Sequence, residues 1–453
     1  MIKDKRFYKN VIAITIPIAV QNLISLATSL MDTVMLGRAD NTGVFLSGSS
    51  LANQPFFILS IISFGLSGAA TVLTSQYWGK RDVKSIRTIF SIVLKIAFIF
   101  SAIIASAVLI VPETIMGLYS NNAEIIAAGT DYLRIIGWAY VLFGLSGTMI
   151  CMIRSVELVK ISVVVNLSSF VINVFLNWVL IFGNLGAPAL GIRGAAFATL
   201  TARTLEFIIT FVYIFFIDKR LCFKPKHLFL FDKIFAKDLL MHGSPVFINE
   251  FIWSLGTTLQ SAILGHINYA SGDPVAANSI ASMTQQLSTV IIFGVANAAA
   301  VIIGKSVGEG SFKRAFEEAK ALKFMSYVVG AAACVSILLL KNVIVTFYTV
   351  PEETKILAGN LMTAVAFITF FVSISSITIV GILRGGGDTR FCLIAEMITL
   401  WLVALPLALT GMLLKLPVVA VLLLMKIDEP LKGIICVIRI NKNKWIKSLT
   451  RET

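Results

Sequence analysis

The segment Gly65-Leu-Ser-Gly-Ala-Ala-Thr-Val72 decides the fold, because it recurs in the second half of the chain as Gly294-Val-Ala-Asn-Ala-Ala-Ala-Val301. Each copy begins with a glycine and lies in a long apolar segment. Other residues that interrupt the apolar pattern recur in the same order and at almost the same spacing: Pro17 with Pro245, Gly37 with Gly265, Gly79 with Gly308 and Arg154 with Arg384. Apolar residues align easily by chance, but proline, glycine and arginine in register do not. The sequence therefore predicts an internal repeat.

Long apolar segments continue on both sides of these copies, through almost all of the 453 residues. Hydrophobic residues make up 57% of the chain and charged residues only 14%, whereas a soluble domain usually has about 25% charged residues. A membrane-spanning helix needs about 20 apolar residues, and its backbone groups must be hydrogen-bonded within the protein. We therefore predict twelve transmembrane helices, over residues 11–36, 54–77, 86–111, 128–152, 161–182, 194–217, 240–265, 279–303, 322–347, 357–382, 391–413 and 417–440.

The predicted fold is an all-α membrane protein whose twelve transmembrane helices form two six-helix, pseudo-symmetric lobes. Six helices separate each pair of equivalent residues, and this even number gives both halves the same orientation. Transporters built from such repeats bind substrate between the two halves and alternate access by rocking them. We expect an N-terminal lobe at residues 1–217, a basic cytoplasmic linker at 218–239 and a C-terminal lobe at 240–453.

The distribution of charge predicts the orientation of the chain. Most of the 38 lysines and arginines lie in the terminal tails and in the loops on the same side, whereas the opposite loops carry only Arg38, Arg193, Lys341, Lys355 and Lys415. Because basic residues gather in cytoplasmic loops, we expect a multi-pass protein of the cell membrane with both termini in the cytoplasm. The net charge of +14 then reflects topology and lipid contact, and we expect no nucleic-acid partner.

Several short motifs occur in order along this repeat. The first helix contains Leu30-Met-Asp-Thr-Val-Met-Leu-Gly37, the fifth contains Asn173-Val-Phe-Leu-Asn177, and the tenth ends in Leu383-Arg-Gly-Gly-Gly-Asp-Thr389. With Gly186-Ala-Pro-Ala-Leu-Gly191 and Gly194-Ala-Ala-Phe-Ala-Thr199, they resemble the multidrug and toxic compound extrusion (MATE) transporters over nearly the whole chain. The resemblance implies a central cavity and export of organic, often cationic, compounds in exchange for Na+ or H+.

Asp32 is the leading candidate for the coupling site. An ionisable group inside a spanning helix costs about 2.5 kcal/mol or more, so such groups are functional by default. The resemblance implies that Asn173, Asn177 and Thr199 supply oxygen ligands or hydrogen bonds beside it. Na+ would favour such oxygens, by analogy with other hard cations, whereas a proton would rest on Asp32 itself. The alternative is an aspartate that serves helix packing alone.

The chain also departs from the family pattern. A subgroup of the family has an acidic residue in the tenth helix where this chain has Ser373, and some members have a second carboxylate where this chain has Asn177. The choice between Na+ and H+ therefore stays open. Apart from a possible Na+, we expect no metal and no cofactor.

Glu250 is the matching candidate in the second half of the chain, for a substrate site or a second cation site. We group it with Gln260, Met31, Met35 and Met283, because flexible methionines suit a surface that accepts different ligands. The alternative for each residue is helix packing or contact with lipid.

Other ionisable residues in the predicted spans are interpreted as structural. Arg203 and Glu206 are three positions apart on one helix and are expected to form an ion pair. Lys426, Asp428 and Glu429 are expected to pair with each other or to lie near a helix end, and the role of Glu396 stays open.

These features favour a secondary active antiporter that exports organic compounds in exchange for Na+ or H+ by alternating access, and we expect it to be a monomer. The alternative is a flippase of related architecture for a lipid-linked or glycosylated precursor. Such a flippase should have a cavity rich in arginine and lysine for phosphate, which this sequence does not indicate. An enzyme is not expected, because the sequence contains no recognisable catalytic motif.

Overall fold

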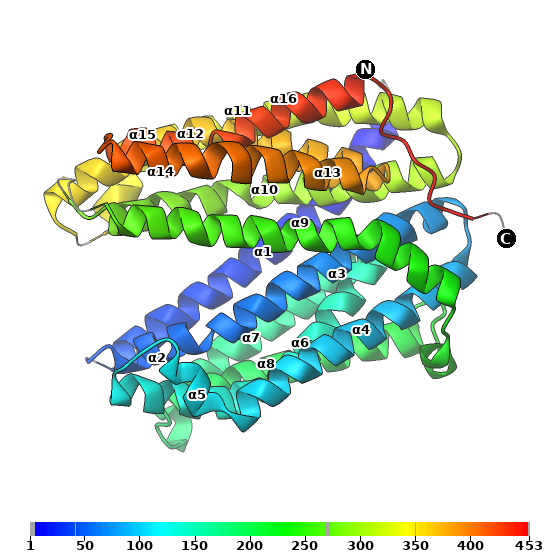
Figure 1. Cartoon of the computed structure of the whole chain (residues 1–453). Helices are drawn as coiled ribbons and strands as arrows, with labels where there is room; N and C mark the ends of the chain where they lie inside the picture. The colour runs from blue at the N-terminus through cyan, green and yellow to red at the C-terminus, as the bar shows by residue number, and fades with distance from the viewer. Residues whose placement is uncertain (1–4, 41, 268–271, 349, 452–453) are drawn as a thin grey trace. The chain divides into compact units, whose positions relative to one another are not determined.

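The computed structural model describes residues 5–40, 42–267, 272–348 and 350–451, and these residues form helices and connecting segments without any β-strand. Ten helical segments among them are long and apolar enough to cross a membrane (Figure 1). The prediction of an all-α membrane protein is therefore confirmed. The chain packs into two compact units, and the long helices α1 (Lys5–Ala39) and α3 (Gln54–Gly79) contribute residues to both.

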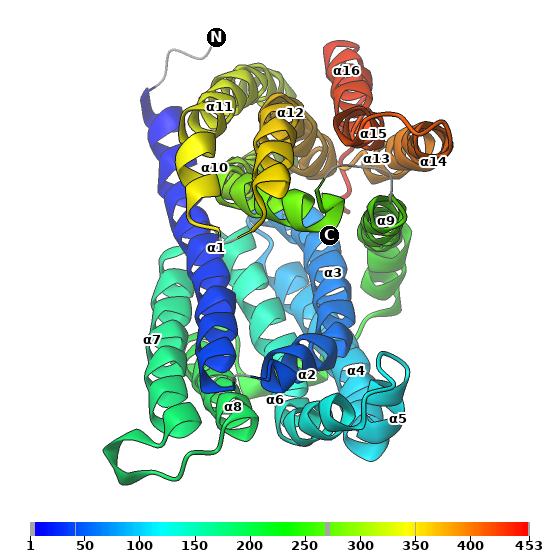
Figure 2. The same cartoon turned by 90° about the vertical axis from the view of Figure 1, so that its left-hand side faces the viewer.

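The N-terminal unit consists of Val20–Ala70 and Asp82–Leu239. Besides parts of α1 and α3, it contains α2 (Val44–Ala52), α4 (Val83–Ile110), α5 (Pro112–Gly117), α6 (Ala123–Ser155), α7 (Lys160–Phe182), the turn η1 (Asn184–Gly186), α8 (Ile192–Val212), and the turns η2 (Tyr213–Ile217) and η3 (Pro225–Phe229). Helix α6 packs against α2, α4, α5 and α8, and α7 packs along α8 (Figure 2). Buried alanines of α6 and α8 let these helices approach closely, which drives association where lipid removes the hydrophobic effect.

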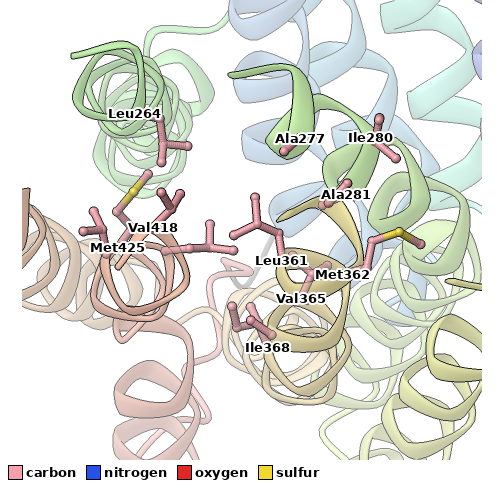
Figure 3. Close-up of a cluster of buried hydrophobic side chains, with 14 of the residues drawn as sticks. Leu264, Ala277, Ile280, Ala281, Leu361, Met362, Val365, Ile368, Val418 and Met425 are labelled. Carbon is pink, nitrogen blue, oxygen red and sulfur yellow. The ribbon is translucent and has the colours of Figure 1, made fainter. Parts of the chain in front are cut away.

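The C-terminal unit consists of Met1–Ala19, Thr71–Arg81 and Leu240–Thr453. Besides parts of α1 and α3, it contains all but the first residues of α9 (Lys233–Gly265), together with α10 (Pro274–Gly308), α11 (Phe312–Thr346), α12 (Glu352–Ser376), η4 (Ile377–Leu383), α13 (Thr389–Glu396), η5 (Met397–Ala404), α14 (Leu405–Leu413), α15 (Val418–Met425) and α16 (Asp428–Asn441). Helix α10 packs against α11, α12 and η4. In the apolar core of this unit, Val418 and Met425 of α15 lie beside Leu264 of α9 (Figure 3).

The twelfth predicted helix, residues 417–440, is wrong as a single element, because the structure breaks it into α15 and α16. Pro430 explains the break. Proline has no backbone N–H, so it cannot donate to the carbonyl of Lys426, but it is tolerated in the first turn of a new helix. The tenth and eleventh predicted helices are also irregular, since the π-helical segments η4 and η5 continue α12 and α13.

Helix α9 begins at Lys233, which is earlier than the predicted start at residue 240. It is not among the ten segments that meet the membrane-spanning criterion, although it is 33 residues long. Asn249, Glu250 and Gln260 lower its mean hydropathy. The other predicted span outside the ten, residues 417–440, does not meet the criterion because its two helices, α15 and α16, have only 8 and 14 residues.

Candidate functional site

Asp32 lies on α1 within the N-terminal unit, and the amide of Asn177 on α7 binds it directly. The Asn177 Nδ2 donates to Asp32 Oδ1 at 2.5 Å and to Asn173 Oδ1 at 3.2 Å. The Asn173 Nδ2 in turn donates to the hydroxyl of Thr199 on α8 at 3.2 Å. The four residues expected at the coupling site therefore form one continuous hydrogen-bond network, which we call the Asp32 network.

The connection between α7 and α8 fixes how these two helices, which carry Asn173, Asn177 and Thr199, lie against each other. Gly183 ends α7 with φ = 75° and Gly191 precedes α8 with φ = 53°, a left-handed conformation that glycine adopts without strain. Gly194 then allows close packing, since a Cβ at this position would lie 2.4 Å from the carbonyl oxygen of Leu180. Asn173 and Asn177 are one turn apart on α7 and therefore face the same side, toward Asp32 and Thr199.

The Asp32 network contains one unsatisfied acceptor. Asn177 is fully buried, and its side-chain oxygen has no hydrogen-bond partner among the described residues. A buried oxygen without a donor is costly, because it has lost its contact with water. Together with the Asp32 carboxylate, the Asn173 amide oxygen and the Thr199 hydroxyl, it makes a set of hard oxygen ligands. Such a set fits a small cation such as Na+, and the carboxylate alone also suits a proton.

Tyr132 also lies next to this network, although the sequence did not single it out. Tyr132 of α6 is buried, and its hydroxyl lies beside Thr199 and Asn53, with Asp32 and Arg203 close enough to act on it electrostatically. No spacing pattern distinguishes Tyr132 from the other eight tyrosines, so sequence reasoning had no signal for it.

The expected ion pair between Arg203 and Glu206 is confirmed, with 2.7 Å between Arg203 Nη1 and Glu206 Oε2. Glu206 is buried and also accepts a hydrogen bond from Ser146 at 2.8 Å. The Arg203 guanidinium lies 5.0 Å from the centre of the Phe143 ring, in a cation–π contact. Because Arg203 and Glu206 neutralise each other, Asp32 is left as a carboxylate without an ion pair of its own among the residues that the structure describes.

The residues grouped with Glu250 are divided between the two units. In the C-terminal unit, Glu250 binds Arg384 at 2.7 Å, whereas Gln260 accepts from Lys426 at 2.7 Å and donates to the carbonyl of Met425 at 2.7 Å. In the N-terminal unit, Met35 packs against the apolar core and Met31 is partly buried. Met283 is a partly buried residue of α10.

The Glu250 contact has a counterpart in the first half of the chain. Arg154, the repeat equivalent of Arg384, donates to Gln21 at 3.3 Å. Gln21 lies four residues after Pro17 and Glu250 lies five residues after Pro245, so the two partners differ by one position in the repeat. A similar arginine contact thus occurs in both halves, with a neutral partner in one and a charged partner in the other.

The chain is similar in sequence to one known protein family and to several of its relatives. The MatE family model matches residues 17–179 and 245–410, and these segments begin at the two prolines that indicated the repeat. The "Probable multidrug resistance protein NorM" of Thermotoga maritima is 25% identical over 402 residues, covering 88% of this chain and 84% of the relative. The "Uncharacterized transporter YisQ" of Bacillus subtilis is 25% identical over 456 residues, covering 98% of this chain and 96% of the relative.

The fold is also similar to solved structures. The crystal structure of a mutant of the Vibrio cholerae MATE transporter VcmN matches with a TM-score of 0.86 over 96% of this chain and 97% of that chain. Only 15% of the aligned residues are identical, so this similarity describes the fold alone.

Proposed function

We propose, because this chain belongs to the MatE family, that Asp32 couples the export of small organic compounds to the entry of Na+ or H+. The family consists of cation-coupled multidrug efflux transporters, so the chain is a transporter and not an enzyme. The observation that carries the proposal is the hydrogen bond from Asn177 to Asp32, beside an amide oxygen that has no partner among the described residues.

The Asp32 network has the chemistry that antiport requires. Its single carboxylate can be neutralised by a bound ion or proton, and neutralisation removes the free-energy cost of a charge inside the membrane. The packing of α1 against α7 and α8 that is favoured when Asp32 binds a cation therefore differs from the packing favoured when Asp32 is ionised and has no ion bound. A ligand shifts such an equilibrium only by its difference in affinity between the two states. Export follows when substrate and ion favour opposite states.

We propose the predicted lobes as the repeating units, residues 1–217 and 240–453, joined by residues 218–239. The family-model matches at 17–179 and 245–410 support this division, since each falls within one lobe. The asymmetry of lysine and arginine supports placing both termini in the cytoplasm of a cell that carries the protein in its surface membrane. Small organic molecules, the coupling ion and lipid are the partners in this proposal, and the protein acts as a monomer.

Glu250, Gln260, Met31, Met35 and Met283 stay a predicted substrate or second cation site. In the structure Glu250 is engaged by Arg384 and Gln260 by Lys426. A cationic ligand at Glu250 would have to replace Arg384, which makes this a weaker candidate than Asp32.

A binding experiment tests the coupling site. A fluorescent organic cation is titrated into the purified protein in a Na+ series at constant pH, and in a pH series without Na+. Coupling through Asp32 predicts that one of the two cations weakens dye binding, and that Asp32→Asn removes this competition while Glu113→Gln retains it. Glu113 forms an exposed ion pair with Arg134 and serves as the control. Competition that persists in Asp32→Asn would place the coupling site elsewhere.

A further inference from the structure

Lys432 on α16 is the centre of a second buried charge cluster, which lies in the C-terminal unit. Its ammonium nitrogen is 2.8 Å from Asp428 Oδ2, 2.9 Å from Glu429 Oε1 and 3.1 Å from Glu396 Oε1. The side chains of Lys432, Glu396 and Asp428 are only 3 to 4% exposed. We call Lys432, Glu396, Asp428 and Glu429 the Lys432 cluster. They are distinct from the residues of the Asp32 network.

The helices around the cluster are irregular at the points where they contact it. Glu396 is the last residue of α13 before the π-helical segment η5, and Ser375 lies near the end of α12, just before the π-helical segment η4. Asp428 and Glu429 form the first turn of α16, directly after the break between α15 and α16. Discontinuous helices within the membrane and π-helical segments are both typical of binding sites in membrane proteins.

The carboxylates of the cluster outnumber the nearby cations by one. Three carboxylates meet the single ammonium of Lys432, and the other cation next to them in the described part of the chain is Lys426, which binds Gln260. From α12, the hydroxyl of Ser375 donates to Glu429 and carries no charge. The thiols of Cys392 and Cys436 also lie close enough to interact electrostatically with members of the cluster. With all three acids ionised, these acids and the two lysines would have a net charge of −1.

The charged residues farther along these helices do not remove this excess. Arg384, which is close enough to act on Glu396, is neutralised by Glu250 at 2.7 Å. Arg439 and Lys447 both bind Asp388, and their side chains are 26% and 46% exposed, so Asp388 and water stabilise their charges.

Asp428 is the carboxylate of the cluster whose charge is least compensated. It is buried, and while its Oδ2 binds Lys432, its Oδ1 has no hydrogen-bond partner within the described ranges. A buried carboxylate oxygen with neither a donor nor a cation is unfavourable in its ionised form. Neutralisation of one carboxyl group removes the excess charge. A metal ion would have to displace the Lys432 ammonium from the point where the carboxylates converge, whereas a proton would not.

We propose that the Lys432 cluster is a proton-binding site, in which Glu396, Asp428 and Glu429 together hold one exchangeable proton at neutral pH. The proton is shared among acids on two helices, α13 and α16. Ser375 of α12 contacts one of these acids, Glu429. Binding or release of the proton therefore changes the charge at the junction of α12, α13 and α16. This site is separate from Asp32, and the inference does not depend on the proposed coupling there.

Infrared difference spectroscopy on purified protein in lipid detects this proton directly. The C=O stretch of a protonated carboxyl group is recorded at neutral pH in H2O and in D2O, in an Asp32→Asn parent so that Asp32 does not contribute. Two nearly isosteric variants of this parent, Asp428→Asn and Glu396→Gln, each remove one negative charge from the cluster. Glu113→Gln in the same parent is the matched control at an exposed acid.

The parent is expected to show a band equivalent to one protonated carboxyl group. Each cluster variant is expected to lose this band, because the two remaining acids then balance Lys426 and Lys432 without a proton. The control retains the band. A third variant, Lys432→Met, is expected to strengthen the band, since the cluster then lacks a cation. The absence of a band in the parent, or a band that survives both Asp428→Asn and Glu396→Gln, overturns the proposal.

Discussion

Gly79 and Gly308 each face the backbone carbonyl that lies one helical turn before the other glycine. A Cβ atom at Gly79 would lie 2.1 Å from the oxygen of Lys305, and a Cβ atom at Gly308 would lie 1.8 Å from the oxygen of Gln76. The two glycines occupy equivalent positions in the repeat. The ends of α3 and α10 therefore meet at a contact with local two-fold character inside the C-terminal unit, where only glycine allows so close an approach.

Gly308→Ala is expected to destabilise the protein, because the added methyl group would collide with backbone that cannot rotate away. Overpacking of this kind costs about 1–3 kcal/mol, and a contact of 1.8 Å places the variant at the upper end. The measurement is the thermal unfolding midpoint in detergent. Gly359→Ala in α12 is the control, since a Cβ there meets none of the described atoms within 4 Å, and it should leave the midpoint unchanged or slightly raised. Equal midpoints for the two variants would contradict the close approach.

The sequence alone predicted the all-helical fold and the repeat because apolar length and punctuating residues are local signals. Pro17, Pro245 and the paired glycines are visible without any structure. The grouping of Asp32 with Asn173, Asn177 and Thr199 came from a resemblance, and the structure joins these residues by hydrogen bonds. Their role in coupling stays a prediction, because these hydrogen bonds establish that the side chains are close together and not that they bind an ion.

The sequence did not predict the Lys432 cluster, because its members come from α13 and α16 and only tertiary packing brings them together. Lys426, Asp428 and Glu429 were expected to pair with each other or to lie near a helix end. They do lie at helix ends, since Lys426 directly follows α15 and the two acids form the first turn of α16, but Lys432 is the cation that binds both acids. The break before α16 was missed although Pro430 marks it, because the apolar residues on either side continue the hydropathy signal of a single span.

Glu250→Gln is expected to be tolerated, because Arg154, the repeat equivalent of Arg384, already has a glutamine, Gln21, as its partner. Glutamine retains an acceptor for Arg384, whereas Glu250→Ala leaves the buried guanidinium without its partner. Breaking a buried ion pair costs about 3–5 kcal/mol, and the 26% exposure of Glu250 places the alanine variant near the lower end.

Thermal unfolding and dye efflux in the same preparation check this prediction. Full stability together with lost efflux in Glu250→Gln would instead favour Glu250 as part of a substrate or cation site.

Gly386→Ala is expected to release the C-terminal tail. Trp445 is fully buried, and a Cβ atom at Gly386 would lie 2.3 Å from its ring. Lys447 is held in the same region, since its backbone N–H donates to the Gly386 oxygen at 2.8 Å and its ammonium binds Asp388 at 2.5 Å. Limited trypsin digestion should cut after Lys444 and Lys447 faster in this variant than in wild type. Cleavage at the wild-type rate would show that the tail is not held by this contact, and Gly359→Ala again serves as the control.

In the proposed mechanism, export is coupled to a cation through Asp32. The most direct test is efflux of a fluorescent organic cation from vesicles with Na+ and H+ gradients imposed separately, comparing wild type, Asp32→Asn and the control Glu113→Gln. We expect one gradient to drive efflux in wild type and in the control. Asp32→Asn should abolish this efflux although thermal unfolding shows that the variant protein is folded. Efflux that is independent of both gradients and unchanged by Asp32→Asn would exclude coupling through Asp32 and favour a flippase mechanism.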